Sequence, residues 1–234
     1  GGSEDDVHII LFSGSIDGKS QIEDESLERY SVLRSIAAIR RCDVALLLID
    51  AQDGVTEQDT KIAGLIREEG KAVVVVVNKW DAVEKDTGTM NKFIAEVREN
   101  LKFMAYAPIL FISALTGQRV NRVLEAVRSA HAEATRRVTT GLLNDILTDA
   151  QAALQPPATS GRRLKIYYAL QVSTNPQTIR LFVNDPKLVT PAYKSYIEKA
   201  IRARFGLEGA PLRIFMKARS RKSVSEFRND FKES

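Results

Sequence analysis

The sequence predicts a parallel α/β domain followed by a smaller α+β domain, and three observations support this. Continuous apolar runs alternate with helical segments over residues 26–137, which is typical of a parallel sheet covered on both faces. Gln155-Pro156-Pro157 and Ser160-Gly161 then break the pattern and indicate a domain boundary. The charge also changes there: residues 1–155 carry 18 Lys and Arg against 24 Asp and Glu, and residues 156–234 carry 16 against 6.

The first domain begins with a predicted amphipathic helix, Ser26–Arg41, whose two final arginines suit a helix C-terminus. Asp53-Gly54 then forms a turn, and Thr56 with Asp59 resembles the capped start of a helix. The other predicted elements are strands at Val44–Ile49, Ala72–Val77 and Ile109–Ile112, and helices at Thr56–Arg67, Thr89–Asn100 and Val120–Arg137.

The second domain is predicted to have the order α-β-β-α-β. Asn175-Pro176 joins the first two strands, which therefore form an antiparallel hairpin. The predicted elements are a helix at Thr139–Leu154, strands at Leu164–Val172 and Thr178–Val183, a helix at Tyr193–Arg204 and a strand at Leu212–Lys217. We expect the domains to span residues 1–138 and 139–218, followed by a basic, poorly ordered tail at 219–234.

The composition is that of an ordinary globular protein, with 44% apolar and 27% charged residues. No apolar run approaches the ~18 residues that span a bilayer, and the acidic start, Gly1–Asp6, is unlike a signal peptide. We therefore expect a cytoplasmic or organelle-stromal protein with no membrane partner. Cys42, the single cysteine, is expected to be a buried thiol, and neither His8 nor His131 has a neighbouring metal-ligand pattern.

The first motif with a chemical role is Asn78-Lys79-Trp80-Asp81, which directly follows the valine-rich strand. Ligands of α/β proteins bind at the carboxyl ends of such strands. The Asp81 carboxylate can accept hydrogen bonds from N1 and the exocyclic amino group of guanine, which adenine does not offer in that pattern. The Asn78 side chain can contact the base edge and tie neighbouring loops, and the Lys79 stem can cover the ring.

The second motif, Ser113-Ala114-Leu115, follows the next predicted strand. It has the position and composition of the second base-recognition loop of Ras-like GTPases, in which the alanine N–H donates to the guanine carbonyl. Two such motifs at the ends of successive strands, with a helix between them, predict a guanine nucleotide site.

These motifs and their flanking residues resemble the second GTPase domain of the Der (EngA) family. The matching stretches are Asp50-Ala51, Gly54–Asp59, Val76–Asp81, Ile112–Gln118, Thr140–Asn144, Leu164–Tyr168 and Phe182–Pro186, and the likeness spans Leu27 to about Lys217. The resemblance implies an N-terminally incomplete α/β Ras-like GTPase domain and a small α+β KH-like domain. It also implies GTP or GDP as ligand, Mg²⁺ in the intact family, and assembly of the large ribosomal subunit. The implied partners are ribosomal RNA or that subunit, and the intact protein's first GTPase domain.

The phosphate-binding half of a Ras-like domain is not recognisable in the sequence. The helix beginning at Ser26 leaves too few residues before it for a phosphate loop, its helix and switch I. Residues 13–20 fit a phosphate loop at Lys19 poorly, because Ser13 stands where glycine is needed and acidic residues follow. In the family, this stretch corresponds to switch II, but Phe12-Ser13-Gly14-Ser15 stands in place of Asp-Thr-Ala-Gly. We therefore expect little GTP hydrolysis, and a non-catalytic RNA- or ribosome-binding module on a remnant GTPase scaffold is the alternative.

The basic second domain favours a polyanionic partner such as RNA. Gly206-Leu207-Glu208-Gly209 fits the Gly-x-x-Gly string of KH modules, but it follows a predicted helix, where glycine is expected as a C-cap, and Glu208 would repel phosphate. RNA contact is therefore assigned to basic residues that neutralise phosphates without reading bases: Arg162, Arg163, Lys165, Arg219, Arg221 and Lys222.

Overall fold

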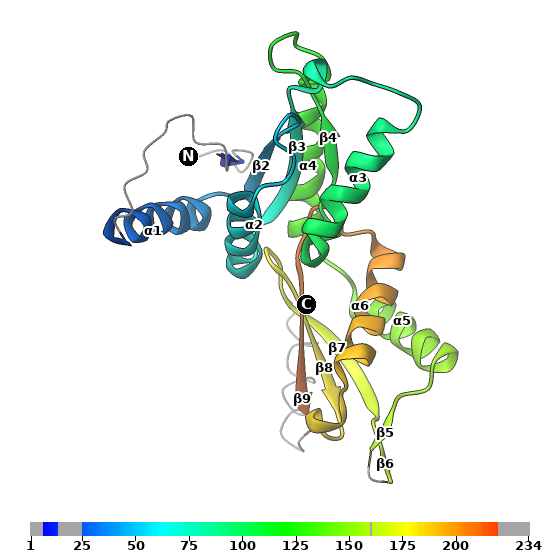
Figure 1. The fold of residues 1–234 in the computed structure, drawn as a ribbon. Helices are drawn as coiled ribbons and strands as arrows, with labels where there is room; N and C mark the ends of the chain where they lie inside the picture. The colour runs from blue at the N-terminus through cyan, green and yellow to red at the C-terminus, as the bar shows by residue number, and fades with distance from the viewer. Residues whose placement is uncertain (1–6, 14–24, 160, 220–234) are drawn as a thin grey trace, which may run out of the picture. The chain divides into compact units, whose positions relative to one another are not determined.

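A computed structural model describes residues 7–13, 25–159 and 161–219, with the backbone alone at 25–32 and 159 (Figure 1). The chain divides into two units. The first comprises residues 1–135 together with Leu207–Pro211, and the second comprises residues 136–206 and 212–234. Lys19, in the stretch that fits a phosphate loop poorly, and residues 220–234 of the predicted tail lie outside the described residues.

The first unit contains a four-stranded sheet in the order β1-β2-β3-β4, and all of its strand pairs are parallel. Its core strand, β3, has residues Ala72 to Val77 at most 1% exposed. Burial on both faces explains why this strand is a valine run without polar alternation. The strands are β1 (Ile9–Ser13), β2 (Val44–Asp50), β3 (Ala72–Asn78) and β4 (Ile109–Phe111).

Helices cover both faces of this sheet, as Figure 1 shows for α2 and α4. Residues from α2 and α3 share one hydrophobic core with alternate residues of β2 and β3, and α4 packs against the same two strands. The helices are α1 (Glu25–Arg41), α2 (Glu57–Glu69), α3 (Thr89–Asn100) and α4 (Asn121–Thr135), with 3-10 turns at η1 (Trp80–Ala82) and η2 (Lys102–Met104). The predicted parallel α/β domain is confirmed.

A capping box begins α2, as the sequence predicts. The Thr56 side chain accepts a hydrogen bond from the Asp59 N–H, and the Asp59 carboxylate accepts one from the Thr56 N–H. These bonds satisfy backbone donors that the first helical turn leaves free. The helix ends at Gly70, whose left-handed conformation suits a C-cap.

The second unit is an α+β structure with a three-stranded sheet ordered β7-β8-β9. Strands β7 and β8 form the predicted antiparallel hairpin, and β8 pairs with β9 in parallel. Its elements are α5 (Thr140–Ala153), β5 (Ala158–Thr159), β6 (Arg162–Arg163), β7 (Ile166–Ser173), β8 (Gln177–Val183), η3 (Pro186–Leu188), α6 (Pro191–Phe205) and β9 (Leu212–Ala218). The two-residue strands β5 and β6 were not predicted, because they are too short to show alternation.

The Gly206–Gly209 segment has the local structure that a helix end requires. Gly206 is the C-cap of α6, with a φ of 81° and its N–H donated to the Arg202 carbonyl. Leu207–Pro211 belong to the first unit, and within that unit the Gly209 N–H donates to the Tyr106 carbonyl and the Val73 N–H donates to the Gly209 carbonyl. Gly209 is buried there, so this glycine contributes to packing.

Candidate guanine-recognition site

The six residues predicted to recognise guanine follow two neighbouring parallel strands. Asn78 ends β3, and Lys79 and Asp81 follow it. Ser113, Ala114 and Leu115 follow β4, which pairs with β3 in parallel. Because parallel strands end at the same edge of a sheet, both predicted loops lie at one edge.

Hydrogen bonds join the two loops. The Ala114 N–H donates to Oδ1 of Asn78 at 2.9 Å, and the Trp80 N–H donates to the Ile112 carbonyl at 3.1 Å. Asn78 therefore ties the neighbouring loops, as the sequence suggested. A guanine carbonyl approaching the Ala114 N–H would share or replace the bond to Asn78.

Trp80 anchors the first loop in the core. Its side chain is only 4% exposed, and its ring lies against Phe93 and Phe111, with centroid distances of 5.7 and 4.5 Å. Such aromatic contacts add to the stability gained by burial. Burial of Trp80 leaves the next residue, Asp81, exposed at the sheet edge. Trp80 is part of the sequence motif, but its role as an anchor was not predicted from the sequence.

Lys79 is held by a carboxylate from the neighbouring strand. Its Nζ lies 2.6 Å from Oδ2 of Asp50, and its backbone adopts the left-handed conformation with a φ of 60°. Burial of the Asp50 carboxyl raises its pKa, but hydrogen bonds from Lys79 and from the Gln52 N–H, with the Lys79 charge, lower it by more. The net pKa of Asp50 is below its ordinary value, so the carboxylate is ionised at neutral pH.

Sequence reasoning missed the role of Asp50. The only signal was its position, because Asp50 ends β2 just as Asn78 ends β3, and these two residues are paired in the sheet register. The pair fixes the Lys79 ammonium toward Asp50, which leaves the aliphatic stem as the part of Lys79 available to cover a ring.

The second loop divides into a buried support and an exposed tip. Ser113 is fully buried, its Oγ accepts from the Thr116 N–H, and its N–H donates to the Gln118 carbonyl. Leu115, in contrast, is 88% exposed. An apolar side chain this exposed, beside Ala114, could lie against a planar ligand.

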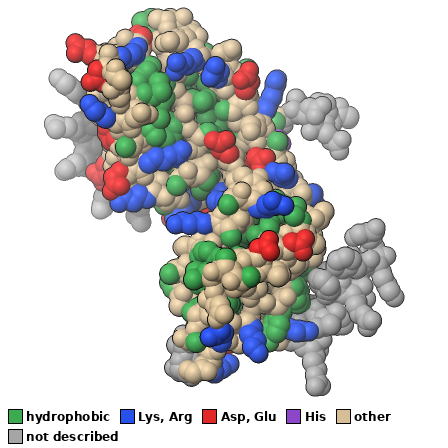
Figure 2. All heavy atoms as spheres, turned by 90° about the vertical axis from the view of Figure 1, so that its right-hand side faces the viewer, with side chains coloured by type: hydrophobic (Ala, Val, Ile, Leu, Met, Phe, Trp, Pro, Cys, Tyr) green, Lys and Arg blue, Asp and Glu red, His purple; other side chains and the backbone are tan. Residues whose placement is uncertain are grey.

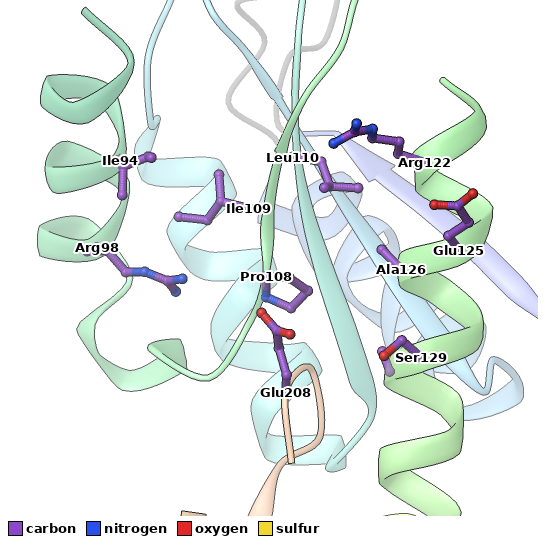
Figure 3. Close-up of a pocket in the computed structure, with 11 residues that line it drawn as sticks. Ile94, Arg98, Pro108, Ile109, Leu110, Arg122, Glu125, Ala126, Ser129 and Glu208 are labelled. Carbon is purple, nitrogen blue, oxygen red and sulfur yellow. The ribbon is translucent and has the colours of Figure 1, made fainter. Parts of the chain in front are cut away.

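A separate hollow of about 540 Å³ lies in the first unit, away from these six residues. Figure 3 shows Ile109 and Leu110 of β4 between α3 and α4, with Arg98 and Glu208 toward one end and Arg122 toward the other. None of the six predicted residues lines this hollow. Within the described ranges, no three His, Cys, Asp or Glu side chains are grouped to hold a metal ion, and no helix is long and apolar enough to cross a membrane.

Each of the two units matches a family of known proteins. Residues 30–133 match the family model of the elongation factor Tu GTP-binding domain, and residues 137–217 match the C-terminal KH-domain-like family of EngA bacterial GTPase enzymes. GTPase Der of Alkaliphilus metalliredigens is 50% identical over 216 residues, and GTPase Der of Caldanaerobacter subterraneus subsp. tengcongensis is 51% identical over 212. The chain belongs to the Der (EngA) family of GTPases.

The chain spans about half the length of the Der proteins it matches. The alignment to the Alkaliphilus metalliredigens protein covers 92% of this chain and 49% of that protein, and the Caldanaerobacter alignment covers 91% and 48%. The predicted resemblance to Der is therefore confirmed, as are the Ras-like α/β unit and the KH-like α+β unit.

The solved structures that are similar to this Der-family chain include two of Era. Era bound to MgGDPNP and a 16S ribosomal RNA fragment is 19% identical with a TM-score of 0.41, covering 86% of this chain and 74% of that one. Aquifex aeolicus Era Y63A bound to GDP.AlF4- is 18% identical with a TM-score of 0.40 and the same coverage.

Proposed function

We propose that this chain binds GDP and GTP through the guanine base, at the edge formed by the loops after β3 and β4. The observation that carries the proposal is the Asn78–Ala114 hydrogen bond, because it brings the two motifs to one place. The GTP-binding character of the matching family supports it. Asn78, Lys79, Asp81, Ser113, Ala114 and Leu115 form the proposed base site.

Each residue has a distinct role in this proposal. The exposed Asp81 carboxylate accepts from guanine N1 and the exocyclic amino group, and the Ala114 N–H donates to the carbonyl. Leu115 and the Lys79 stem lie against the two faces of the ring. Ser113 is buried and positions the loop rather than touching the base.

The proposal covers the base and assigns no ligand to Mg²⁺. Residues 14–24, which include most of the stretch that fits a phosphate loop poorly, lie outside the described part of the chain. The described residues fit the guanine edge because a carboxylate and a backbone donor follow adjacent strands. In the intact family, Mg²⁺ would act on the phosphates of the bound nucleotide.

Competition against a fluorescent GDP analogue tests base recognition with the whole chain. GDP should displace the analogue at least about 100-fold more effectively than ADP, because adenine presents the wrong hydrogen-bonding pattern to Asp81 and Ala114. Equal displacement by GDP and ADP would contradict the proposal.

We further propose that the second unit binds ribosomal RNA, in assembly of the large ribosomal subunit. The excess of 16 Lys and Arg over 6 Asp and Glu in residues 156–234 supports this. Of the predicted phosphate contacts, Arg162 lies 3.2 Å from Oδ2 of Asp185, Arg163 donates to Gln155, and Lys165 is exposed. Arg221 and Lys222 lie outside the described residues. Retention of the chain on large-subunit RNA at low salt and its release at high salt would support this proposal, and no binding at low salt would contradict it.

A further inference from the structure

Strand β4 is an edge of the first unit's sheet. Within the described part of the chain, it pairs with β3 alone. The Val75 N–H donates to the Pro108 carbonyl, which therefore points toward β3. Because backbone groups alternate between the two edges of a strand, Leu110 also bonds toward β3, whereas the N–H and C=O groups of Ile109 and Phe111 point outward. These outward groups have no hydrogen-bond partner among the described residues.

A groove runs along this edge, between α3 and α4. The hollow of about 540 Å³ continues into a second hollow of about 180 Å³, and the two share Ile94, Ile109, Leu110 and Arg122 in their linings. Figure 3 shows β4 between the two helices. Figure 2 views the side that is on the right in Figure 1 and shows hydrophobic side chains on the first unit, with charged side chains among them. All of the lining residues belong to the first unit, and the larger volume lies within the range of about 300–1,000 Å³ that is typical of ligand pockets.

The two ends of the groove differ in charge. At one end, burial lowers the pKa of Arg98 and the negative charge of Glu208 opposes that shift, so these two ions offset each other. At the other end, Arg119 and Arg122 are exposed, and neither forms an ion pair with a described residue. Figure 3 shows the Arg122 guanidinium reaching toward β4, whereas the Glu125 carboxylate stays beside α4. This second end therefore carries excess positive charge.

We propose that the groove binds an extended segment of a partner protein, which joins the sheet beside β4 and places an acidic side chain against Arg119 and Arg122. The outward backbone groups of Ile109 and Phe111 supply the main-chain hydrogen bonds for this added strand. Alternate side chains of the segment then face the groove, where Ile94 of α3 offers an apolar contact.

Other occupants use less of the groove. A helix satisfies its own backbone groups, so it would leave the edge of β4 unpaired. A second copy of this chain would present a β4 edge that is itself flanked by α3 and α4, and these helices would keep the two strands apart. A small anion could bind the two arginines but would leave the apolar lining empty. An extended acidic segment uses the backbone groups, the apolar lining and the charge together.

Fluorescence anisotropy with the whole chain tests this, using labelled acetyl-Asp-Asp-Val-Thr-Val-Thr-Val-amide and the same sequence reversed. Alternating Val and Thr favour an extended chain, and the two orders place the acidic end correctly for a parallel or an antiparallel addition. One of the peptides should bind. Methylating one alternate set of its backbone nitrogens should reduce the affinity about tenfold or more, because the hydrogen bonds to β4 are lost, and methylating the other set should have little effect. This comparison uses no protein variant, so misfolding cannot affect it.

Amide hydrogen exchange measured by NMR locates the added strand. The Ile109 and Phe111 N–H groups should exchange about tenfold or more slowly when the peptide is bound, because they gain hydrogen bonds. The Leu110 N–H, which already bonds toward β3, should be unaffected. Slowing at Leu110 alone, or at none of the three, would contradict pairing at this edge.

Charge variants test the acidic end of the peptide. Replacing Arg119 and Arg122 together by Gln should weaken peptide binding about threefold or more, because two exposed ion pairs are lost. Arg128→Gln is the matched control, since Arg128 is an exposed arginine of α4 that lines neither hollow, and it should leave the affinity unchanged.

Two outcomes would overturn the proposal. Equal binding of both methylated forms would exclude backbone pairing, and no binding of either peptide at about 1 mM would exclude the segment itself. Neither result would affect the proposed guanine site, because none of its six residues lines either hollow.

Discussion

The backbone N–H of Ala114 donates a 2.9 Å hydrogen bond to the side-chain oxygen of Asn78. These residues come from loops that follow different strands, so the bond fixes the distance between the two halves of the proposed guanine site. Asp81 and Ala114 can then present an acceptor and a donor to one base edge, which neither loop could do alone.

Replacing Asn78 by Ala should weaken GDP binding by about tenfold and lower the free energy of unfolding by about 1 kcal/mol, because one hydrogen bond between loops is lost. Isothermal titration and urea unfolding measure the two effects. Asn100→Ala is the matched control, because that side chain bonds only within α3, to the Glu96 carbonyl. An Asn78→Ala chain with unchanged GDP affinity would show that the tie between the loops does not matter to the site.

The Asp50–Lys79 ion pair should make stability depend on pH in the acid range. The pKa of Asp50 is lowered in the folded protein, so its contribution is present above the unfolded value of about 3.9 and is lost as pH falls through the folded pKa. We expect Asp50→Asn to lower the free energy of unfolding at pH 7 by about 1 kcal/mol or less, because Lys79 is half exposed. The difference from wild type should shrink toward pH 3 in urea titrations. A difference that stays constant between pH 7 and pH 3 would contradict the assignment.

Gly209→Ala should destabilise the fold by about 3 kcal/mol. A Cβ at Gly209 would lie 2.6 Å from the Ala130 Cβ and 3.1 Å from the Val73 carbonyl oxygen, and the φ of +74° is itself unfavourable for alanine. Gly141→Ala in α5, where a Cβ meets no atom within 4 Å, should instead stabilise slightly. Thermal unfolding compares the two variants. If Gly209→Ala left stability unchanged but abolished RNA binding, the Gly206–Gly209 loop would be a binding element after all.

Binding of RNA by the second unit should be steeply salt-dependent. About three to five phosphate contacts to a single strand give a slope of log K against log salt of roughly −2 to −3.5. Replacing Arg162, Arg163 and Lys165 together by Ser should flatten the slope and weaken all RNA sequences alike. Replacing Lys61, Lys92 and Lys102 on the first unit is the control, because each is exposed and paired with an acidic residue there. A slope unchanged by the first replacement would exclude that cluster.

The sequence predicted the elements whose signals are local. The valine run of β3 is recognisable because both of its faces are buried, and Thr56 with Asp59 marks the start of α2 because a capping box needs only residues three apart. The Asp50–Lys79 pair was not predictable, because it depends on the register between β2 and β3. The contact of Gly209 with Ala130 likewise joins distant segments of the chain, and only the C-cap at Gly206 had a local signal.

The most direct test of guanine recognition is the pair of affinities for GDP and xanthosine diphosphate, measured on the wild-type chain and on Asp81→Asn. The Asp81 carboxylate only accepts hydrogen bonds, whereas an amide can also donate to the second carbonyl of xanthine. The wild-type chain should prefer GDP, and Asp81→Asn should weaken GDP and favour xanthosine diphosphate. Equal affinity for the two nucleotides in both proteins would contradict the proposed site.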